Sequence, residues 1–143
     1  MGTNIAQLPC DLTVRSSDLQ SAPDAAGRHL ILDLWGGEGL TDIKQIETTM
    51  RRAVEAAGAT LLHIHLHHFT PNFGVSGVAV LAESHISIHT WPELEYSAID
   101  IFMCGDTDPH KAVEIMEQAF KPDRSKLVEI PRGAAAPSGS ASG

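Results

Sequence analysis

At residues 81–93 the chain reads Leu81-Ala82-Glu83-Ser84-His85-Ile86-Ser87-Ile88-His89-Thr90-Trp91-Pro92-Glu93. A serine stands between a carboxylate and a histidine at the end of an apolar run, and a second histidine follows five residues after the serine. We expect strands over residues 75–82 and 85–90. Strand packing alone does not require so many reactive side chains, so the stretch is also a candidate active site.

The sequence on both sides of this stretch predicts four more strands and two helices. The strands are expected over residues 29–35, 61–69, 96–102 and 126–131. Within residues 41–57, Ile46, Met50 and Ala53 recur at helical spacing, and Gly58 follows where a C-terminal cap belongs. The second helix begins at Asp108, a capping residue followed by proline, and runs to about residue 120.

Short connections and two amphipathic helices predict an α+β fold. We expect a two-layer sandwich in which both helices cover one face of an antiparallel β-sheet. The other face of the sheet then needs a packing partner. A second copy of the chain could supply one, so the sequence predicts a homodimer. Residues 1–27 are expected to form a flexible N-terminal segment, residues 28–132 the folded domain, and residues 133–143 a disordered tail.

Composition narrows the class of protein. The chain has 143 residues, of which 43% are hydrophobic and 20% charged, as expected for one globular domain. Its net charge of −8 disfavours nucleic acid and anionic membranes as partners. Apolar runs stay below the roughly 18 residues of a membrane span, and the N-terminus lacks a secretion signal pattern. The cytoplasm is the expected location.

A second histidine group lies on the strand predicted over residues 61–69. With a period of two, His63, His65 and His67 point to one face of the sheet, and Leu62, Ile64 and Leu66 point to the other. Alternating histidines can hold a transition metal. An unprocessed metal-binding protein is therefore one alternative, although no nearby carboxylate or cysteine completes a usual ligand set and no metal ligand is assigned.

The serine at position 84 permits a different chemistry. Its hydroxyl can attack the preceding carbonyl and convert the amide into an ester. If a base then removes the serine Cα proton, β-elimination and hydrolysis leave a pyruvoyl group. The site needs a donor for the oxyanion, a base for the Cα proton and a way to activate the hydroxyl. A pyruvoyl ketone forms a Schiff base with a substrate amine and takes up electrons when carbon dioxide leaves.

Three segments together resemble the prokaryotic S-adenosylmethionine decarboxylases, which make their own pyruvoyl cofactor. They are Phe69-Thr70-Pro71-Asn72-Phe73-Gly74-Val75-Ser76-Gly77, Ala82-Glu83-Ser84-His85 and Phe102-Met103-Cys104-Gly105. The resemblance extends from about residue 29 to about residue 120. It departs from the family pattern at residues 94–97, where Leu-Glu-Tyr-Ser replaces a Gly-Tyr-Ala run that many relatives have.

The resemblance implies a role for each residue of the site. Cleavage is expected at the carbonyl of Glu83, and Ser84 becomes the covalent pyruvoyl group. His89 transfers protons during processing, Ser76 serves processing and catalysis, and Cys104 donates a proton to the decarboxylated carbon. By the same resemblance, Phe69 stacks on the adenine of the substrate. Glu93 accepts hydrogen bonds from the ribose hydroxyls, and the indole of Trp91 lies beside it.

The function implied is conversion of S-adenosylmethionine to its decarboxylated form, the aminopropyl donor for spermidine synthesis. The mature enzyme would contain a β chain of residues 1–83 and an α chain of residues 84–143, with two such pairs forming a dimer. A pyruvoyl-dependent arginine or ornithine decarboxylase is the nearer alternative, with Glu95 as a candidate partner for the cationic end of that substrate.

Overall fold

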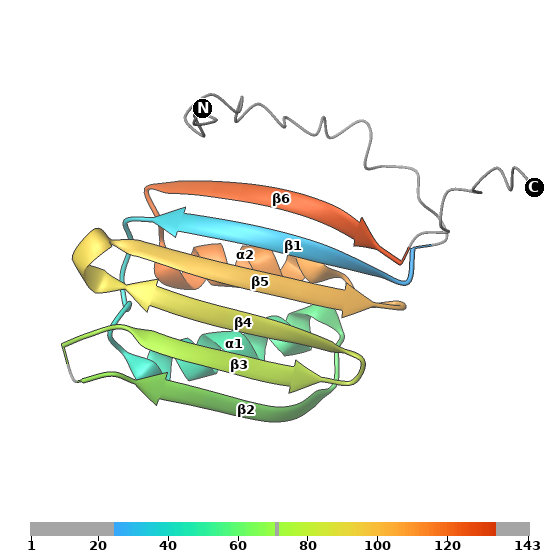
Figure 1. The fold of residues 1–143 in the computed structure, drawn as a ribbon, viewed down its shortest axis with the longest axis horizontal. Coiled ribbons are helices and arrows are strands. Elements are labelled where there is room, and N and C mark those ends of the chain that lie inside the picture. The colour runs from blue at the N-terminus through green and yellow to red at the C-terminus, as the bar shows by residue number, and fades with distance from the viewer. Residues whose placement is uncertain (1–24, 71, 134–143) are drawn as a thin grey trace, which may run out of the picture.

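Six antiparallel strands form one sheet in the order β2-β3-β4-β5-β1-β6, and both helices lie behind the same face (Figure 1). The computed structural model describes residues 25–70 and 72–133. The elements are β1 (Gly27–Trp35), α1 (Ile43–Ala57), β2 (Leu61–His68), β3 (Val75–Leu81), β4 (Ser84–Trp91), the short helix η2 (Pro92–Leu94), β5 (Tyr96–Cys104), α2 (Pro109–Phe120) and β6 (Arg124–Arg132). The predicted two-layer α+β fold is confirmed.

Both helices end where the sequence predicts and α2 starts at the predicted cap, whereas α1 begins at Ile43, two residues later than predicted. Asp42 caps α1 by accepting hydrogen bonds from two main-chain amides, and Gly58 ends the helix in the left-handed conformation. Asp108 caps α2 by accepting a hydrogen bond from the main-chain amide of His110. Pro109 occupies the first turn, where an N–H would have no hydrogen-bond partner within the helix. Each helix therefore starts at a fixed place relative to the strand before it.

The core lies between the helices and one face of the sheet. Leu30, Leu32 and Leu34 of β1 are fully buried and alternate with half-buried residues that face away from the helices. The same alternation runs through β4 and β5, where Ile86, Ile88 and alternate residues of β5 are buried. The opposite face of the sheet, called the outer face below, carries the intervening residues, and no helix of residues 25–70 and 72–133 covers it (Figure 1).

One strand departs from the predicted pattern. Leu62 was expected to point to the same face as Ile64 and Leu66, but it is 64% exposed. A register shift between Leu61 and His63 makes Leu62 an extra residue in β2, so Leu61 takes the buried position in its place. A bulge of this kind depends on how two strands pair. The periodicity of one strand alone therefore does not predict it.

The ends of the predicted domain also differ in detail. β1 begins at Gly27, the last residue of the predicted N-terminal segment, because Gly27 pairs with Cys104 on one side and Arg132 on the other. Residues 1–24 of that segment and residues 134–143 of the predicted tail lie outside the described residues. Within residues 25–70 and 72–133, neither helix has the length and apolar character needed to cross a bilayer.

Candidate active site

The predicted cleavage point lies in the tight turn between β3 and β4. Leu81 pairs with Ser84, so only Ala82 and Glu83 form the turn. Glu83 adopts a φ of 63°, in the left-handed region that costs a non-glycine residue roughly 1 kcal/mol. The Ser84 hydroxyl donates a hydrogen bond to the Ala82 carbonyl at 3.2 Å. The turn therefore holds the Glu83–Ser84 peptide in a strained, exposed position.

The thiol of Cys104 lies against this peptide. Because His85 pairs with Phe102, the end of β5 places Cys104 beside Glu83. The Cys104 Sγ is 3.6 Å from the main-chain carbonyl oxygen of Glu83 and 3.8 Å from its side-chain Oε2. A thiol is a weak hydrogen-bond donor, so this contact directs a proton toward the carbonyl that the Ser84 hydroxyl would attack.

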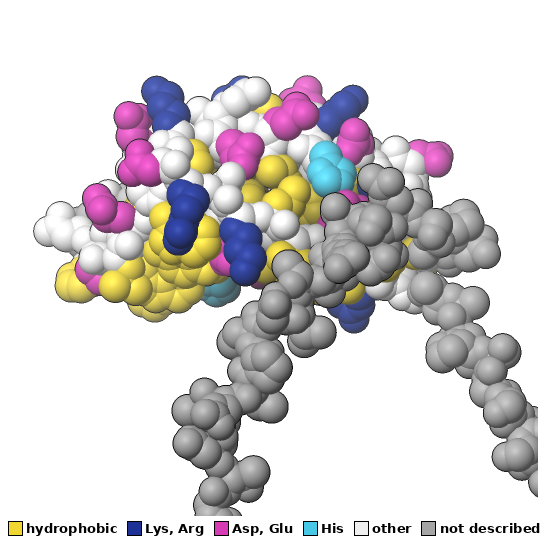
Figure 2. Space-filling model, turned by 90° about the horizontal axis from the view of Figure 1, so that it is seen from above, with side chains coloured by type: hydrophobic (Ala, Val, Ile, Leu, Met, Phe, Trp, Pro, Cys, Tyr) yellow, Lys and Arg dark blue, Asp and Glu magenta, His cyan; other side chains and the backbone are white. Residues whose placement is uncertain are grey.

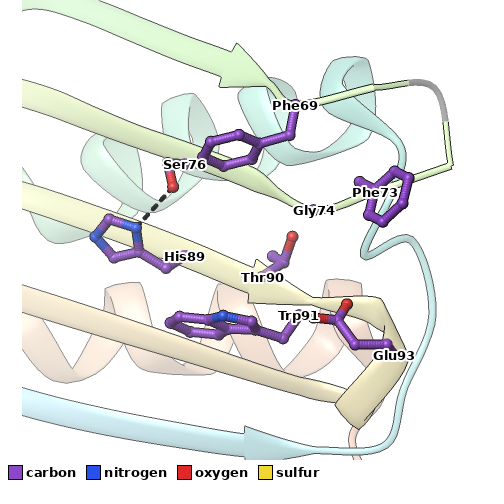
Figure 3. Close-up of a pocket in the computed structure, with 8 residues that line it drawn as sticks. All are labelled: Phe69, Phe73, Gly74, Ser76, His89, Thr90, Trp91 and Glu93. Atoms are coloured by element: carbon purple, nitrogen blue, oxygen red, sulfur yellow. Dashed lines mark hydrogen bonds between the residues drawn. The ribbon is translucent and has the colours of Figure 1, made fainter.

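A serine–histidine pair lies further along the same hairpin. Ser76 of β3 and His89 of β4 are directly opposite in the ladder, and their side chains both emerge on the outer face. The Ser76 Oγ and the His89 Nδ1 are 2.8 Å apart, a normal hydrogen bond (Figure 3). A hydroxyl can donate to or accept from an imidazole nitrogen, so the pair can transfer a proton in either direction.

A pocket of about 250 Å³ opens beside this pair. Figure 3 shows the aromatic rings of Phe69 and Trp91 on either side of the Ser76–His89 hydrogen bond. Glu93, in η2, lies at the end of the pocket next to Trp91. The pocket is lined by Phe69, Phe73, Gly74, Ser76, His89, Thr90, Trp91 and Glu93.

Three of these lining residues, Phe73, Gly74 and Thr90, were not identified from the sequence. A Cβ at Gly74 would overlap the Thr90 carbonyl oxygen, so only glycine lets the chain pass this close to β4. The Thr90 hydroxyl donates to Leu40 O and accepts from Val75 N, which fixes the start of β3. The glycine directly before a strand was the available signal, since such glycines often mark a close backbone approach.

The predicted residues thus form two groups at opposite ends of the hairpin. Glu83, Ser84 and Cys104 lie at the turn, whereas Ser76 and His89 lie with the aromatic pocket at the other end. His89 is five residues beyond Ser84 on β4, which corresponds to about 17 Å of extended chain. One copy of the chain therefore does not bring the two groups into contact.

At the pocket end of the sheet, aromatic side chains continue from Trp91 across β5 and β1, with acidic side chains beside them. The indole of Trp91 stacks on Tyr96 with 5.4 Å between ring centroids, and Trp35 follows at 5.7 Å from Tyr96. The Tyr96 hydroxyl donates to Asp33 at 2.5 Å. Burial, then the hydrogen bond and charge of Asp33, and then the charge of Asp100, raise the pKa of Tyr96 to about 12.

The histidines of β2 lie side by side on the outer face. His63, His65 and His67 share the outer face as predicted, and all three are exposed. The ring of His67 packs edge-on against Phe69 at 4.9 Å. Within the described part of the chain, no group of three or more histidine, cysteine, aspartate or glutamate side chains is arranged to hold a metal ion.

Comparison with known proteins identifies the family. Residues 28–133 match the family model described as S-adenosylmethionine decarboxylase. The chain belongs to the S-adenosylmethionine decarboxylase family. A proenzyme of that name from Thermomicrobium roseum is 44% identical over 108 residues, which cover 75% of this chain and 93% of the relative. The proenzyme from Methanococcus maripaludis strain C5 is 49% identical over 110 residues, covering 75% of this chain and 89% of the relative.

A solved structure in the S-adenosylmethionine decarboxylase family has the same fold. The adenosylmethionine decarboxylase from Aquifex aeolicus superposes with a TM-score of 0.69 at 32% identity, over 78% of this chain and 94% of that one. Membership of the S-adenosylmethionine decarboxylase family was thus predicted correctly from the motifs. The two alternatives, a basic amino acid decarboxylase and a histidine-strand metal protein, gain no support from these matches.

Proposed function

We propose that this chain cuts itself between Glu83 and Ser84, and that the mature enzyme decarboxylates S-adenosylmethionine with a pyruvoyl group made from Ser84. The main support is the contact between the Cys104 thiol and the carbonyl oxygen of Glu83, 3.6 Å apart. This contact places a donor at the carbonyl where an oxyanion would develop. The relatives are named as proenzymes, which agrees with maturation by cleavage.

The cleavage chemistry balances with residues present in the chain. The Ser84 oxygen bonds to the Glu83 carbonyl carbon, the carbon–nitrogen bond breaks, and the nitrogen takes the hydroxyl proton, which leaves an ester. A base removes the Ser84 Cα proton, the Cβ–oxygen bond breaks, and Glu83 departs as a carboxylate. Water then replaces the freed nitrogen, which leaves as ammonia. We assign proton transfer in these steps to His89, held by Ser76 at 2.8 Å.

The residues around the turn suit a pyruvoyl group. Ser84 starts β4 at an exposed turn, and the thiol of Cys104 is within reach of the peptide that precedes it. When present, the pyruvoyl ketone supplies an electrophile for the substrate amine and an acceptor for the electrons left by carbon dioxide. We assign to Cys104 the proton that the decarboxylated carbon receives, carried on its Sγ.

The aromatic pocket is the proposed binding site for the adenosyl part of the substrate. Phe69 is 58% exposed and Trp91 37% exposed, so both rings offer free faces for stacking on a base. The Glu93 carboxylate lies at the same end and can accept hydrogen bonds from the ribose hydroxyls. The product would be the aminopropyl donor for spermidine synthesis, and a cytoplasmic location stays a prediction from the sequence.

A second copy of the chain would complete this site. The pocket of about 250 Å³ lies below the roughly 300–1,000 Å³ of most small-molecule sites, and its His89 is about 17 Å along β4 from Ser84. In the part of the chain that the structure describes, no helix covers the outer face, which exposes Val80, Trp91 and Ile130. Seen from the β6 edge, hydrophobic side chains gather on part of the sheet side, whereas acidic and basic side chains are interspersed over the helix side (Figure 2).

The proposed dimer therefore packs two outer faces together. A two-fold axis running across the strands between the two sheets would bring the Ser84 end of one copy over the His89 end of the other. Such an interface is isologous, because the same surface is used by both copies. Each of the two sites would then take its pyruvoyl and Cys104 from one copy, and Ser76, His89 and the aromatic pocket from the other.

The intact mass of denatured protein tests the proposal. We expect two fragments divided between residues 83 and 84, the second lighter by one ammonia than a fragment that begins with serine. The Ser84→Ala variant should stay whole. The cleaved protein should release carbon dioxide from carboxyl-labelled S-adenosylmethionine and not from arginine or ornithine. A wild-type chain that stays uncleaved on incubation would refute the proposal, and release from arginine or ornithine would refute the substrate assignment.

A further inference from the structure

Four side chains form one row across the outer face at the pocket end of the sheet. The register pairs Trp91 of β4 with Tyr96 of β5, and it pairs Trp35 of β1 with both Tyr96 and Arg124 of β6. The ring centroids of Trp91 and Tyr96 are 5.4 Å apart, and those of Tyr96 and Trp35 are 5.7 Å apart. The guanidinium carbon of Arg124 lies 4.0 Å from the Trp35 ring centroid. These spacings are typical of interacting aromatic rings and of a cation–π contact, so the row is continuous up to Trp91, which lines the pocket.

The two sides of the Trp91 indole differ. On the side of β5, the ring of Tyr96 lies nearly parallel to it, with 21° between the planes. On the side of β3, Gly74 contributes no side chain to the space between Trp91 and Phe69 (Figure 3). The Gly74 carbonyl accepts a hydrogen bond from the Phe69 amide at 3.2 Å, and a Cβ at Gly74 would overlap the main chain of β4. The row therefore has a gap, one strand wide, where it reaches the pocket.

We propose that Tyr96 is a positioning residue for substrate binding: its ring holds the Trp91 indole in the orientation that lets a planar base stack in the gap over Gly74. This inference rests on the proposed function, in which Phe69 and Trp91 bind the adenosyl part of the substrate. In the sheet, β2 and β4 are separated by two strand spacings, about 9–10 Å. Because aromatic rings in contact have centroids about 4.5–7 Å apart, one base fits between the two rings and completes the row.

Tyr96 is held more firmly than the indole that it supports. Its hydroxyl donates a hydrogen bond to Asp33 at 2.5 Å, and Trp35 packs on the side of its ring away from Trp91. Trp91, in contrast, is 37% exposed and faces the gap. Without the Tyr96 ring, the indole could turn into other rotamers. Binding of the base would then have to order the indole again, and that ordering costs affinity.

The size of the effect follows from the stacking contact. An aromatic pair contributes enough, beyond its buried area, to change an equilibrium constant by about 2- to 12-fold. Tyr96→Leu and Tyr96→Met remove the ring, and each should raise the KM for S-adenosylmethionine by about that factor. The kcat should change by less than about 2-fold, because the lost interaction acts on binding alike in the ground state and the transition state. Tyr96→Phe keeps the ring, so it should restore KM to within about 2-fold of wild type.

Steady-state decarboxylation and adenosine binding test the inference together. The kinetic assay compares cleaved wild type with the three Tyr96 variants and with Arg124→Met, a control that alters only the far end of the row. For binding, every protein also carries Ser84→Ala and Trp35→Phe, so that the chain stays uncleaved and Trp91 is its only tryptophan. The fluorescence of Trp91 then reports adenosine that stacks on it. Urea unfolding of each variant confirms that it is folded at the assay temperature.

The expected result is a rise of KM and of the adenosine dissociation constant by the same factor in both ring-free variants, with Tyr96→Phe and Arg124→Met close to wild type. Unchanged constants in the ring-free variants, or a loss of kcat at constant KM, would overturn the inference and leave the proposed function standing. The same holds if adenosine leaves the fluorescence of Trp91 unchanged in the parent protein. A wild-type chain that stays uncleaved, seen first by intact mass, would instead remove the proposed function and this inference with it.

Discussion

Pairing two inactive variants tests whether each site is shared between two copies. One chain carries Ser84→Ala and cannot form the pyruvoyl group, and the other carries His89→Ala and lacks the processing histidine. His89 is exposed on the outer face, and Ser84 lies at the exposed turn rather than in the buried core, so neither change should prevent folding. Co-expression with two different affinity tags allows the mixed dimer to be isolated by two successive purification steps.

The expected size of the effect follows from the separation along β4. Because Ser84 and His89 are about 17 Å apart in one chain, the proposed dimer combines Ser84 of one copy with His89 of the other in each site. In the mixed dimer, one site then has both residues and the other has neither. We expect about half of the wild-type activity per dimer, since a two-fold dimer contains two equivalent sites. Either variant alone should process at least about 100-fold more slowly than wild type.

Cleavage of the His89→Ala chain is the direct measurement. Mass spectrometry of the denatured mixed dimer should find this chain cut between residues 83 and 84, and the same chain expressed alone should remain whole. The Ser84→Ala chain should be uncleaved in both preparations. If the mixed dimer shows no cleavage and no activity, each site lies within one copy and the reasoning from strand length is wrong. Mixed dimers of two Ser84→Ala chains provide the blank.

Three further predictions concern single residues. Tyr96 is the only tyrosine, so an absorbance titration should give a midpoint near 12, and Asp33→Asn should lower it towards 10. Because the folded pKa is the higher one, this contribution to stability is complete below about pH 10 and is lost as the pH rises through 12. Gly74→Ala should lower the free energy of unfolding by about 1–3 kcal/mol in urea titrations and distort the pocket, since the new Cβ meets the Thr90 carbonyl. Asp42→Ala should cost about 1 kcal/mol in the same assay and Asp42→Asn much less, because asparagine also caps a helix.

The sequence predicts this fold well where burial and helix capping act within one element. Both helices and all six strands were expected, because alternating burial and the caps at Gly58 and Asp108 leave local patterns. The errors lie where an element is fixed by its neighbours. Gly27 joins β1 only because it has partners on both sides, and the bulge at Leu62 appears only when β2 pairs with β3.

Sequence proximity is a poor guide to proximity in the site. Ser84 and His89 are five residues apart, and a motif search treats them as one unit, yet an extended strand holds them about 17 Å apart. Residues distant in sequence meet instead: Cys104 reaches Glu83 across β4 and β5, and Ser76 reaches His89 across β3 and β4. The residues of a motif that spans a whole strand therefore lie in two groups, one at each end of the strand. For the two groups to act together, the opposite end of another strand must lie over each of them. A copy of the same chain, turned by a two-fold axis, meets that requirement without any additional sequence.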